Sequence, residues 1–73
     1  YWVDRVRELY SPATLERLLA SNQPDTRRAA TWALRYLGTE CHYRPLGILL
    51  RDDSRSVRTS ADEARRAICY RTQ

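Results

Sequence analysis

The sequence predicts an all-α fold built from a repeated pair of helices. Apolar residues recur at spacings of three and four, as on one face of a helix, and no segment of useful length alternates apolar and polar residues as a strand would. Shifting the chain against itself by 31 residues brings identical residues together, and a repeat of this length is typical of helical-pair repeats. The identities are Leu15 with Leu46, Leu18 with Leu49, Leu19 with Leu50, Arg27 with Arg58, Ala30 with Ala61, Ala33 with Ala64 and Arg35 with Arg66.

The composition is that of one small globular domain. The chain has 73 residues, of which 42% are apolar and 30% charged, a balance that argues against a disordered chain. No apolar run is long enough for a membrane span or a secretory leader. The net charge is +4, and all thirteen basic residues are Arg. Because Met is absent even from position 1, we expect the chain to be a piece of a longer repeat protein.

We expect five helices, joined by loops of a few residues that make consecutive helices antiparallel neighbours. Their expected ranges are 2–10, 12–21, 25–37, 44–51 and 54–70. The first of these fits the register as the second helix of an incomplete pair, because Val3 and Val6 fall on Leu34 and Leu37. This helix would cap the first full pair, and we assign Trp2 to its packing.

Start and stop signals support the next two helices. Ser11 followed by Pro12 is a helix cap followed by a proline at the first helical position. Pro24 and Asp25 open the following helix in the same way. Gly38 comes directly after Leu37, where we expect a glycine in the left-handed conformation to end the helix.

The last two helices repeat this arrangement. Pro45 is expected to open the helix at 44–51, and Asp53 or Ser54 to cap the helix at 54–70. Small residues on both long helices would let neighbouring helices approach closely, so that the leucines of the shorter helices can reach across. These small residues are Ala30, Ala33, Ala61 and Ala64.

Two stretches carry a family resemblance. At 25–38 and at 52–68, acidic turn residues precede Arg-x-x-Ala-x-x-Ala and an aliphatic residue. This pattern resembles the HEAT-like repeat, in the short form also found in phycobilisome lyases. The resemblance implies a right-handed α-solenoid, a superhelix of helical hairpins. It makes 1–73 a single domain with an N-terminal capping helix at 1–11 and repeats at 12–42 and 43–73.

The chain departs from the family pattern at several positions. Thr26 stands where the family prefers Val, and 67–69 lacks the usual Gly. Arg65 stands where the first repeat has Leu34, and a polar residue there suits the solvent-facing end of a repeat stack. The alternative is that further repeats follow in a longer parent chain.

The resemblance also implies a structural ladder between arginines and turn acids. In the family, the Arg of the motif pairs with an acid in the turn of its own or a neighbouring repeat. The residues at these positions are Arg27, Arg58, Asp25, Asp52 and Asp53. We expect them to hold the stack together and not to bind a ligand.

A second set of residues is the candidate partner-binding strip. Arg28, Trp32 and Arg35 are spaced four and three residues apart on one helix face. The register places Thr59, Glu63 and Arg66 beside them. The second helices of stacked pairs usually line the concave surface in the family, and Trp and Arg are enriched at binding hot spots. The alternative is that Trp32 folds over the first helix as a core residue; both interpretations stay open here.

The sequence therefore predicts a non-enzymatic protein-interaction module that acts as a scaffold or regulator. The alternative is nucleic-acid binding, in which Arg28, Arg35 and Arg66, joined by Arg44 or Arg55, would meet phosphates. A third interpretation is a purely structural segment. Exposed ends of the stack could also pair into a weak homodimer, with Ile48 taking part.

No cofactor, metal or catalytic residue is predicted. Cys41, His42 and Cys69 lack the spacing of a metal site, and we interpret His42 as a loop residue. No nucleophile stands near a base in a known arrangement, and no glycine-rich phosphate loop is present. We expect a cytoplasmic location with both thiols reduced, although the cysteines fall at the same edge of adjacent repeats, where a disulfide is conceivable.

Overall fold

The computed structural model describes residues 2–72, without the side chains of residues 2, 3, 6 and 7. Its elements are α1 (Trp2–Leu9), α2 (Pro12–Leu18), α3 (Pro24–Leu37), α4 (Glu40–Ile48), a 3-10 turn (Leu49–Arg51) and α5 (Arg55–Thr72). The described chain contains no strand, so the predicted all-α class is confirmed. The predictions for Trp2, Val3 and Val6 lie outside the described side chains.

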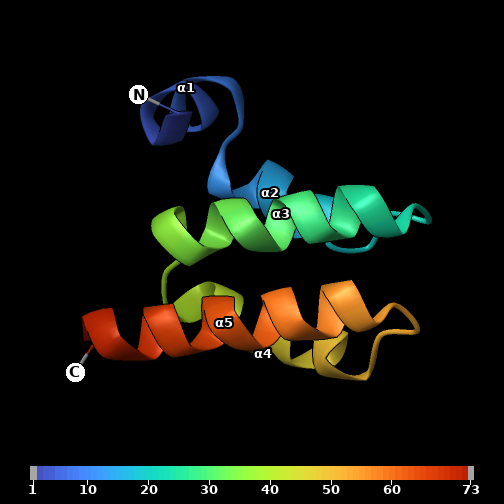
Figure 1. Cartoon of the computed structure of the whole chain (residues 1–73). Coiled ribbons are helices and arrows are strands. Elements are labelled where there is room, and N and C mark those ends of the chain that lie inside the picture. The colour runs from blue at the N-terminus through green and yellow to red at the C-terminus, as the bar shows by residue number, and fades with distance from the viewer. Residues whose placement is uncertain (1, 73) are drawn as a thin grey trace.

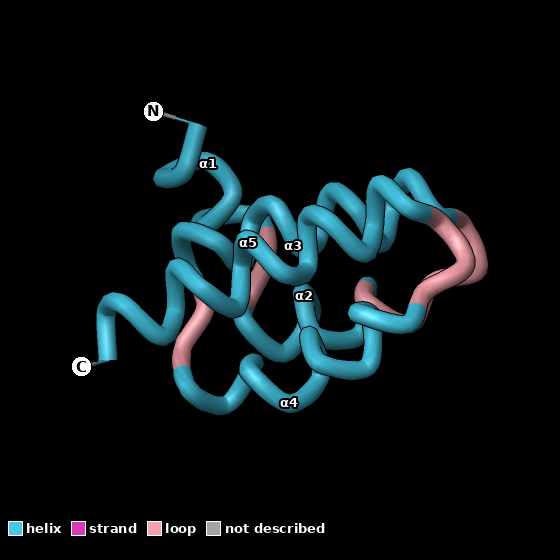
Figure 2. Tube along the Cα trace, turned by 60° about the horizontal axis from the view of Figure 1, so that its bottom comes forward, coloured by secondary structure: helices cyan, strands magenta, loops and turns pink. Residues whose placement is uncertain are grey.

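The helices form two layers (Figures 1 and 2). The long helices α3 and α5 lie side by side and run in the same direction, and α2 and α4 lie behind them. Helix α2 pairs with α3, and α4 with α5, in antiparallel hairpins that we name the first and second hairpin. Helix α1 packs against α3 near the C-terminal end of α3. The first residues of α3 and α5, Pro24 and Arg55, are one 31-residue repeat apart.

Serine hydroxyls cap the starts of α2 and α5. Ser11 Oγ accepts the Thr14 N–H at 3.1 Å, and Pro12 occupies the first turn of α2, as predicted. Ser54 Oγ accepts the Val57 N–H at 3.5 Å at the start of α5. Such caps satisfy N–H groups that the first helical turn leaves without partners.

The start of α4 was predicted wrongly. Pro45 does not open this helix; it lies inside α4, which begins five residues earlier at Glu40. The cause is His42, whose Nδ1 accepts the Thr39 N–H at 3.0 Å. Its Nε2 lies 3.3 Å from the Pro12 carbonyl oxygen, so the ring bridges the two hairpins. His42 is 4% exposed, and the interpretation of it as a loop residue is also wrong.

Gly38 ends α3, but not in the left-handed conformation that we expected. Its φ of −71° and ψ of 152° are those of extended backbone. The glycine is needed for close approach instead. A Cβ atom at this position would lie 2.5 Å from the Leu34 carbonyl oxygen and 2.7 Å from Ile68 Cδ1. Gly38 therefore lets the C-terminal half of α5 pack against the end of α3.

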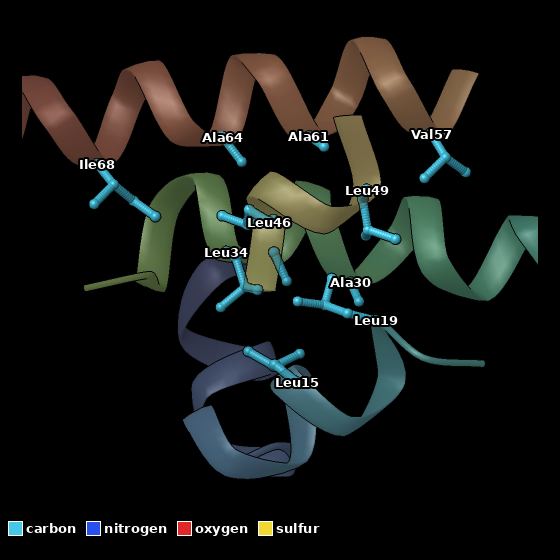
Figure 3. Close-up of a cluster of buried hydrophobic side chains, with 11 residues drawn as sticks. Leu15, Leu19, Ala30, Leu34, Leu46, Leu49, Val57, Ala61, Ala64 and Ile68 are labelled. Carbon is cyan, nitrogen blue, oxygen red and sulfur yellow. The ribbon is translucent and has the colours of Figure 1, made fainter. Parts of the chain in front are cut away.

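One apolar core lies between the two layers (Figure 3). It combines leucines of the short helices and of the turns that follow them with the apolar stripes of the long helices. Its buried members are Leu15, Leu19, Ala30, Ala33, Leu34, Leu46, Leu49, Val57, Ala61, Ala64 and Ile68. Leu15 and Leu46, which correspond in the 31-residue register, are both buried.

A pair of hydroxyls joins α3 to α5 beside this core. Thr31 Oγ1 and Ser60 Oγ are 2.5 Å apart, and both residues are buried. The Thr31 hydroxyl donates to the Arg28 carbonyl oxygen at 2.7 Å, so Ser60 supplies the proton between the two side chains. Both polar groups are thereby satisfied, which a buried hydroxyl requires.

Candidate partner-binding surface

A shallow depression, which we name the α3–α5 hollow, lies between the two long helices. It has a volume of about 370 Å³. Its lining residues are Arg28, Trp32, Arg55, Ser56, Thr59, Ser60 and Glu63. The structure therefore brings together Arg28, Trp32 and Glu63 of the predicted strip, because α3 and α5 run side by side.

Trp32 contributes half-exposed apolar surface to the hollow. Its side chain is 44% exposed, so the interpretation of Trp32 as a core residue is wrong. The ring meets Tyr36 edge to face, with the ring centroids 5.7 Å apart. Tyr36 is equally exposed, and the Arg35 guanidinium carbon lies 5.7 Å from the centroid of its ring. Two aromatic rings and an Arg thus lie together on the outer face of α3.

The other predicted arginines are partly neutralised. Arg35 Nη1 lies 3.4 Å from Glu63 Oε2, which forms an ion pair between α3 and α5 at the edge of the hollow. Arg66 Nε lies 3.2 Å from Asp62 Oδ2, one helical turn away on α5. Arg66 does not line the hollow. It lies on another part of α5, next to Tyr70.

The hollow itself is positively charged. Within residues 2–72, neither Arg28 nor Arg55 forms an ion pair with a carboxylate, whereas Glu63 already faces Arg35. Ser56 and Thr59 add hydroxyls from the first turns of α5, where the helix dipole also favours an anion. The arrangement is chemically suited to a carboxylate next to an apolar group.

Sequence reasoning found only part of the α5 side of this site, namely Thr59 and Glu63. Ser56 and Ser60 were not predicted to take part, and Arg55 was considered only as a phosphate contact. Thr59 was placed beside the strip because it is the counterpart of Arg28 in the register. Arg44, the other proposed phosphate contact, lies on a separate surface with Ile48.

A largely buried ion pair joins the two hairpins. Arg27 Nε lies 2.8 Å from Asp52 Oδ1, and Arg27 Nη2 donates to Asp52 Oδ2 at 3.0 Å. The two side chains are only 14% and 8% exposed. The Arg27 guanidinium holds the pKa of the Asp52 carboxyl below its ordinary value of 3.8; burial opposes this shift, and the Ser54 N–H adds to it.

The other residues of the predicted ladder have different roles. Arg58 Nη1 donates to the backbone carbonyl oxygens of Asp52 and Asp53, at 2.6 and 3.2 Å. Asp53 thus takes part through its backbone carbonyl oxygen. Asp25 lines an apolar groove on the side of α3 that faces away from α5. Arg71, which the sequence did not single out, donates to the carbonyl oxygens of Arg35 and Gly38 and so caps the end of α3.

The remaining candidate residues do not form a site in the described part of the chain. Cys41 and Cys69 are free, exposed thiols. In the described part of the chain no three His, Cys, Asp or Glu side chains lie together as metal ligands, and no helix has the length and apolar character of a membrane span. Comparisons of this chain with protein-family models, with curated proteins and with solved structures found no match.

Proposed function

We propose that this chain is a non-enzymatic protein-interaction module built from two HEAT-like helical hairpins. In this proposal the hairpins stack as a right-handed α-solenoid, and the α3–α5 hollow binds an acidic segment of a partner protein. The module acts as a scaffold or regulatory element and needs no cofactor.

Equivalent backbone contacts in the two hairpins support the repeat interpretation. Arg27 donates to the carbonyl oxygen of Ser21 at 2.7 Å, and Arg58 donates to that of Asp52 at 2.6 Å. Both the donors and the acceptors are 31 residues apart in the chain. The same side chain therefore closes the same turn in each hairpin, which a shared repeat architecture explains.

The observation that carries the binding proposal is the half-exposed Trp32 beside Arg28 and Arg55 in one hollow. A guanidinium binds a carboxylate with two parallel hydrogen bonds, and Trp supplies a large apolar contact area at low entropic cost. Because Arg35 already faces Glu63, Arg28 and Arg55 carry the positive charge that a partner meets. The preferred segment has an acidic residue next to a leucine or an aromatic residue.

Two short fluorescein-labelled peptides test this proposal by fluorescence anisotropy, one alternating Glu with Leu and the other alternating Lys with Leu. We expect the acidic peptide to bind and the basic one not to bind. Arg28→Glu and Arg55→Glu should each weaken binding about tenfold, because each reverses a charge inside the hollow. Arg66→Glu is the matched control, since it makes the same change outside the hollow and should leave affinity within about twofold. Equal losses in all three variants would mean that net charge, and not the hollow, determines binding.

Nucleic-acid binding is the alternative that the same variants address. A labelled single-stranded oligonucleotide would lose affinity steeply with salt if phosphates dominate. In that case Arg66→Glu would weaken binding as much as Arg28→Glu does. The ion pairs of Arg35 and Arg66 argue for the protein-binding proposal, because they leave fewer arginines for a phosphate backbone.

A further inference from the structure

An apolar groove, which we name the α2–α3 groove, lies on the side of α3 that faces away from α5. It has a volume of about 420 Å³, and Leu18, Thr26 and Ala29 are among its lining residues. Ala29 stands two positions from Thr31, which contacts α5. Two helical positions correspond to about 200° around the axis, so the two residues lie on opposite sides of α3.

The second hairpin contains the same surface in a covered state. In the 31-residue register, Leu18, Thr26 and Ala29 correspond to Leu49, Val57 and Ser60. The latter three are buried, and α3 lies along this side of α5 with its Thr31 hydroxyl on Ser60. In the first hairpin Ala29 is exposed, and Leu18 and Thr26 are only partly buried. Helix α1 packs against the C-terminal end of α3, and Tyr10 lines the groove, but Ala29 stays exposed. The internal repeat indicates what covers the remaining part of the groove, namely a helix parallel to α3.

Charge at the edge of the groove adds to this argument. Asp25 lines the groove and corresponds in the register to Ser56. In the α3–α5 hollow, Ser56 shares the lining with Arg28 of the covering helix. A helix that covers the groove as α3 covers α5 would therefore bring a residue at the place of Arg28 next to the Asp25 carboxylate. A basic side chain suits that place.

A second copy of this chain fits the groove less well. Stacked in the same register, the copy would present α5 in the place of α3 and Arg65 in the place of Leu34. Leu34 is fully buried, whereas the Arg65 guanidinium lies over the Tyr43 ring, with its central carbon 3.8 Å from the ring centroid. Stacking a copy in this register would place the Arg65 guanidinium where α3 has the apolar Leu34 side chain. Burying a charge at an apolar position costs free energy.

We propose that the α2–α3 groove docks one amphipathic helix of another protein. The docked helix lies along the part of α3 that α1 leaves uncovered, in the direction that α3 takes along α5. It places small or aliphatic side chains against Leu18 and Ala29, and a Lys or Arg beside Asp25. This site is separate from the α3–α5 hollow and does not depend on the function proposed for the hollow.

A helical peptide with the sequence of α3, residues 24–37, is the probe. It is constrained by a lactam bridge on its outer face, because an isolated helix of this length is marginally stable, and its binding to the whole chain is measured by fluorescence anisotropy. We expect saturable binding that Ala29→Arg weakens about tenfold or more, since the large side chain fills the groove. Thr59→Arg, which makes a similar change in the α3–α5 hollow, should leave the affinity unchanged.

A charge swap tests the register of docking. Asp25→Lys should weaken binding of the original peptide, and a peptide carrying Arg28→Glu should restore it. Absence of saturable binding, or equal affinity for the Ala29→Arg variant, would overturn the proposal. Sedimentation that reveals a dimer of this chain, lost in Ala29→Arg, would make the occupant a second copy and would overturn it as well. Circular dichroism of each variant establishes that the chain is folded.

Discussion

Asp52→Asn is the most informative single test of how the two hairpins are held together. The amide can still accept the Ser54 N–H that Asp52 Oδ2 now accepts at 2.9 Å, but it loses the charge that faces Arg27. The change therefore removes the ion pair and keeps the hydrogen bond within the local turn. It also leaves the Arg27 guanidinium largely buried without its counter-charge.

The expected cost lies between the values for exposed and for buried pairs. Exposed ion pairs contribute about 0–1 kcal/mol, and removing one partner of a buried pair costs about 3–5 kcal/mol. Because the two side chains are 8% and 14% exposed, we expect a loss of about 2 kcal/mol in the free energy of unfolding. For a domain of this size that lowers the Tm by about 8–16 °C.

Thermal unfolding followed by far-UV circular dichroism measures this effect. Asp62→Asn is the matched control, because Asp62 faces Arg66 in an exposed pair that should contribute less than about 1 kcal/mol. Similar Tm values for the two variants would refute the reasoning, because of these two ion pairs only the one formed by Asp52 is largely buried.

The same pair predicts how stability depends on pH. The pKa of Asp52 is lowered from 3.8 in the folded chain, so the carboxylate stabilises the fold only while it is ionised. Its contribution is complete at pH values well above 3.8 and is lost as the pH falls through the lowered pKa. The Tm difference between the original chain and Asp52→Asn should therefore shrink below about pH 4. A Tm difference that stays constant down to pH 2 would contradict the assignment of this stabilisation to the Asp52 carboxylate.

Three further substitutions test the packing, each by chemical denaturation. Gly38→Ala should destabilise the chain by about 1–3 kcal/mol, because the new Cβ would meet the Leu34 carbonyl oxygen and Ile68; an unchanged stability would mean that the close approach is not needed. Leu46→Ala should cost about 2–5 kcal/mol, because Leu46 is fully buried, whereas Ile48→Ala should cost little, because Ile48 is 73% exposed. Equal losses of stability for Leu46→Ala and Ile48→Ala would contradict the assignment of Leu46 to the core.

Much of the fold was readable from the sequence, because its main signals are local or periodic. The leucine spacings and the 31-residue register predicted the long helices to within two residues at each end. The start of α4 was not readable in this way. Pro45 is a strong local signal, but the helix start depends on the His42 ring, which contacts both Thr39 and the distant Pro12. The Thr39–His42 contact is a capping box at local spacing, but a His stands where the usual pattern has Glu or Gln. The contact with Pro12 is long-range and has no signature in spacing.

The site was predicted less completely, for a related reason. The spacing of Arg28 and Trp32 on one helix face was sufficient to place them together. Which residues of α5 face them depends on how far one helix is displaced along the other, and close packing at Gly38 and the Thr31–Ser60 contact set that displacement. Arg55 therefore joins the site, and Arg66 lies beyond it.

Asp52 is a junction of three parts of the chain. Its carboxylate meets Arg27 of the first hairpin, its side chain accepts a backbone N–H of its own turn, and its carbonyl accepts from Arg58. Opening the second hairpin would therefore break the contact that orders Arg27, and fraying of α3 would release the turn before α5. Neither hairpin can melt alone without disturbing the other, so unfolding of the two should be a single cooperative event.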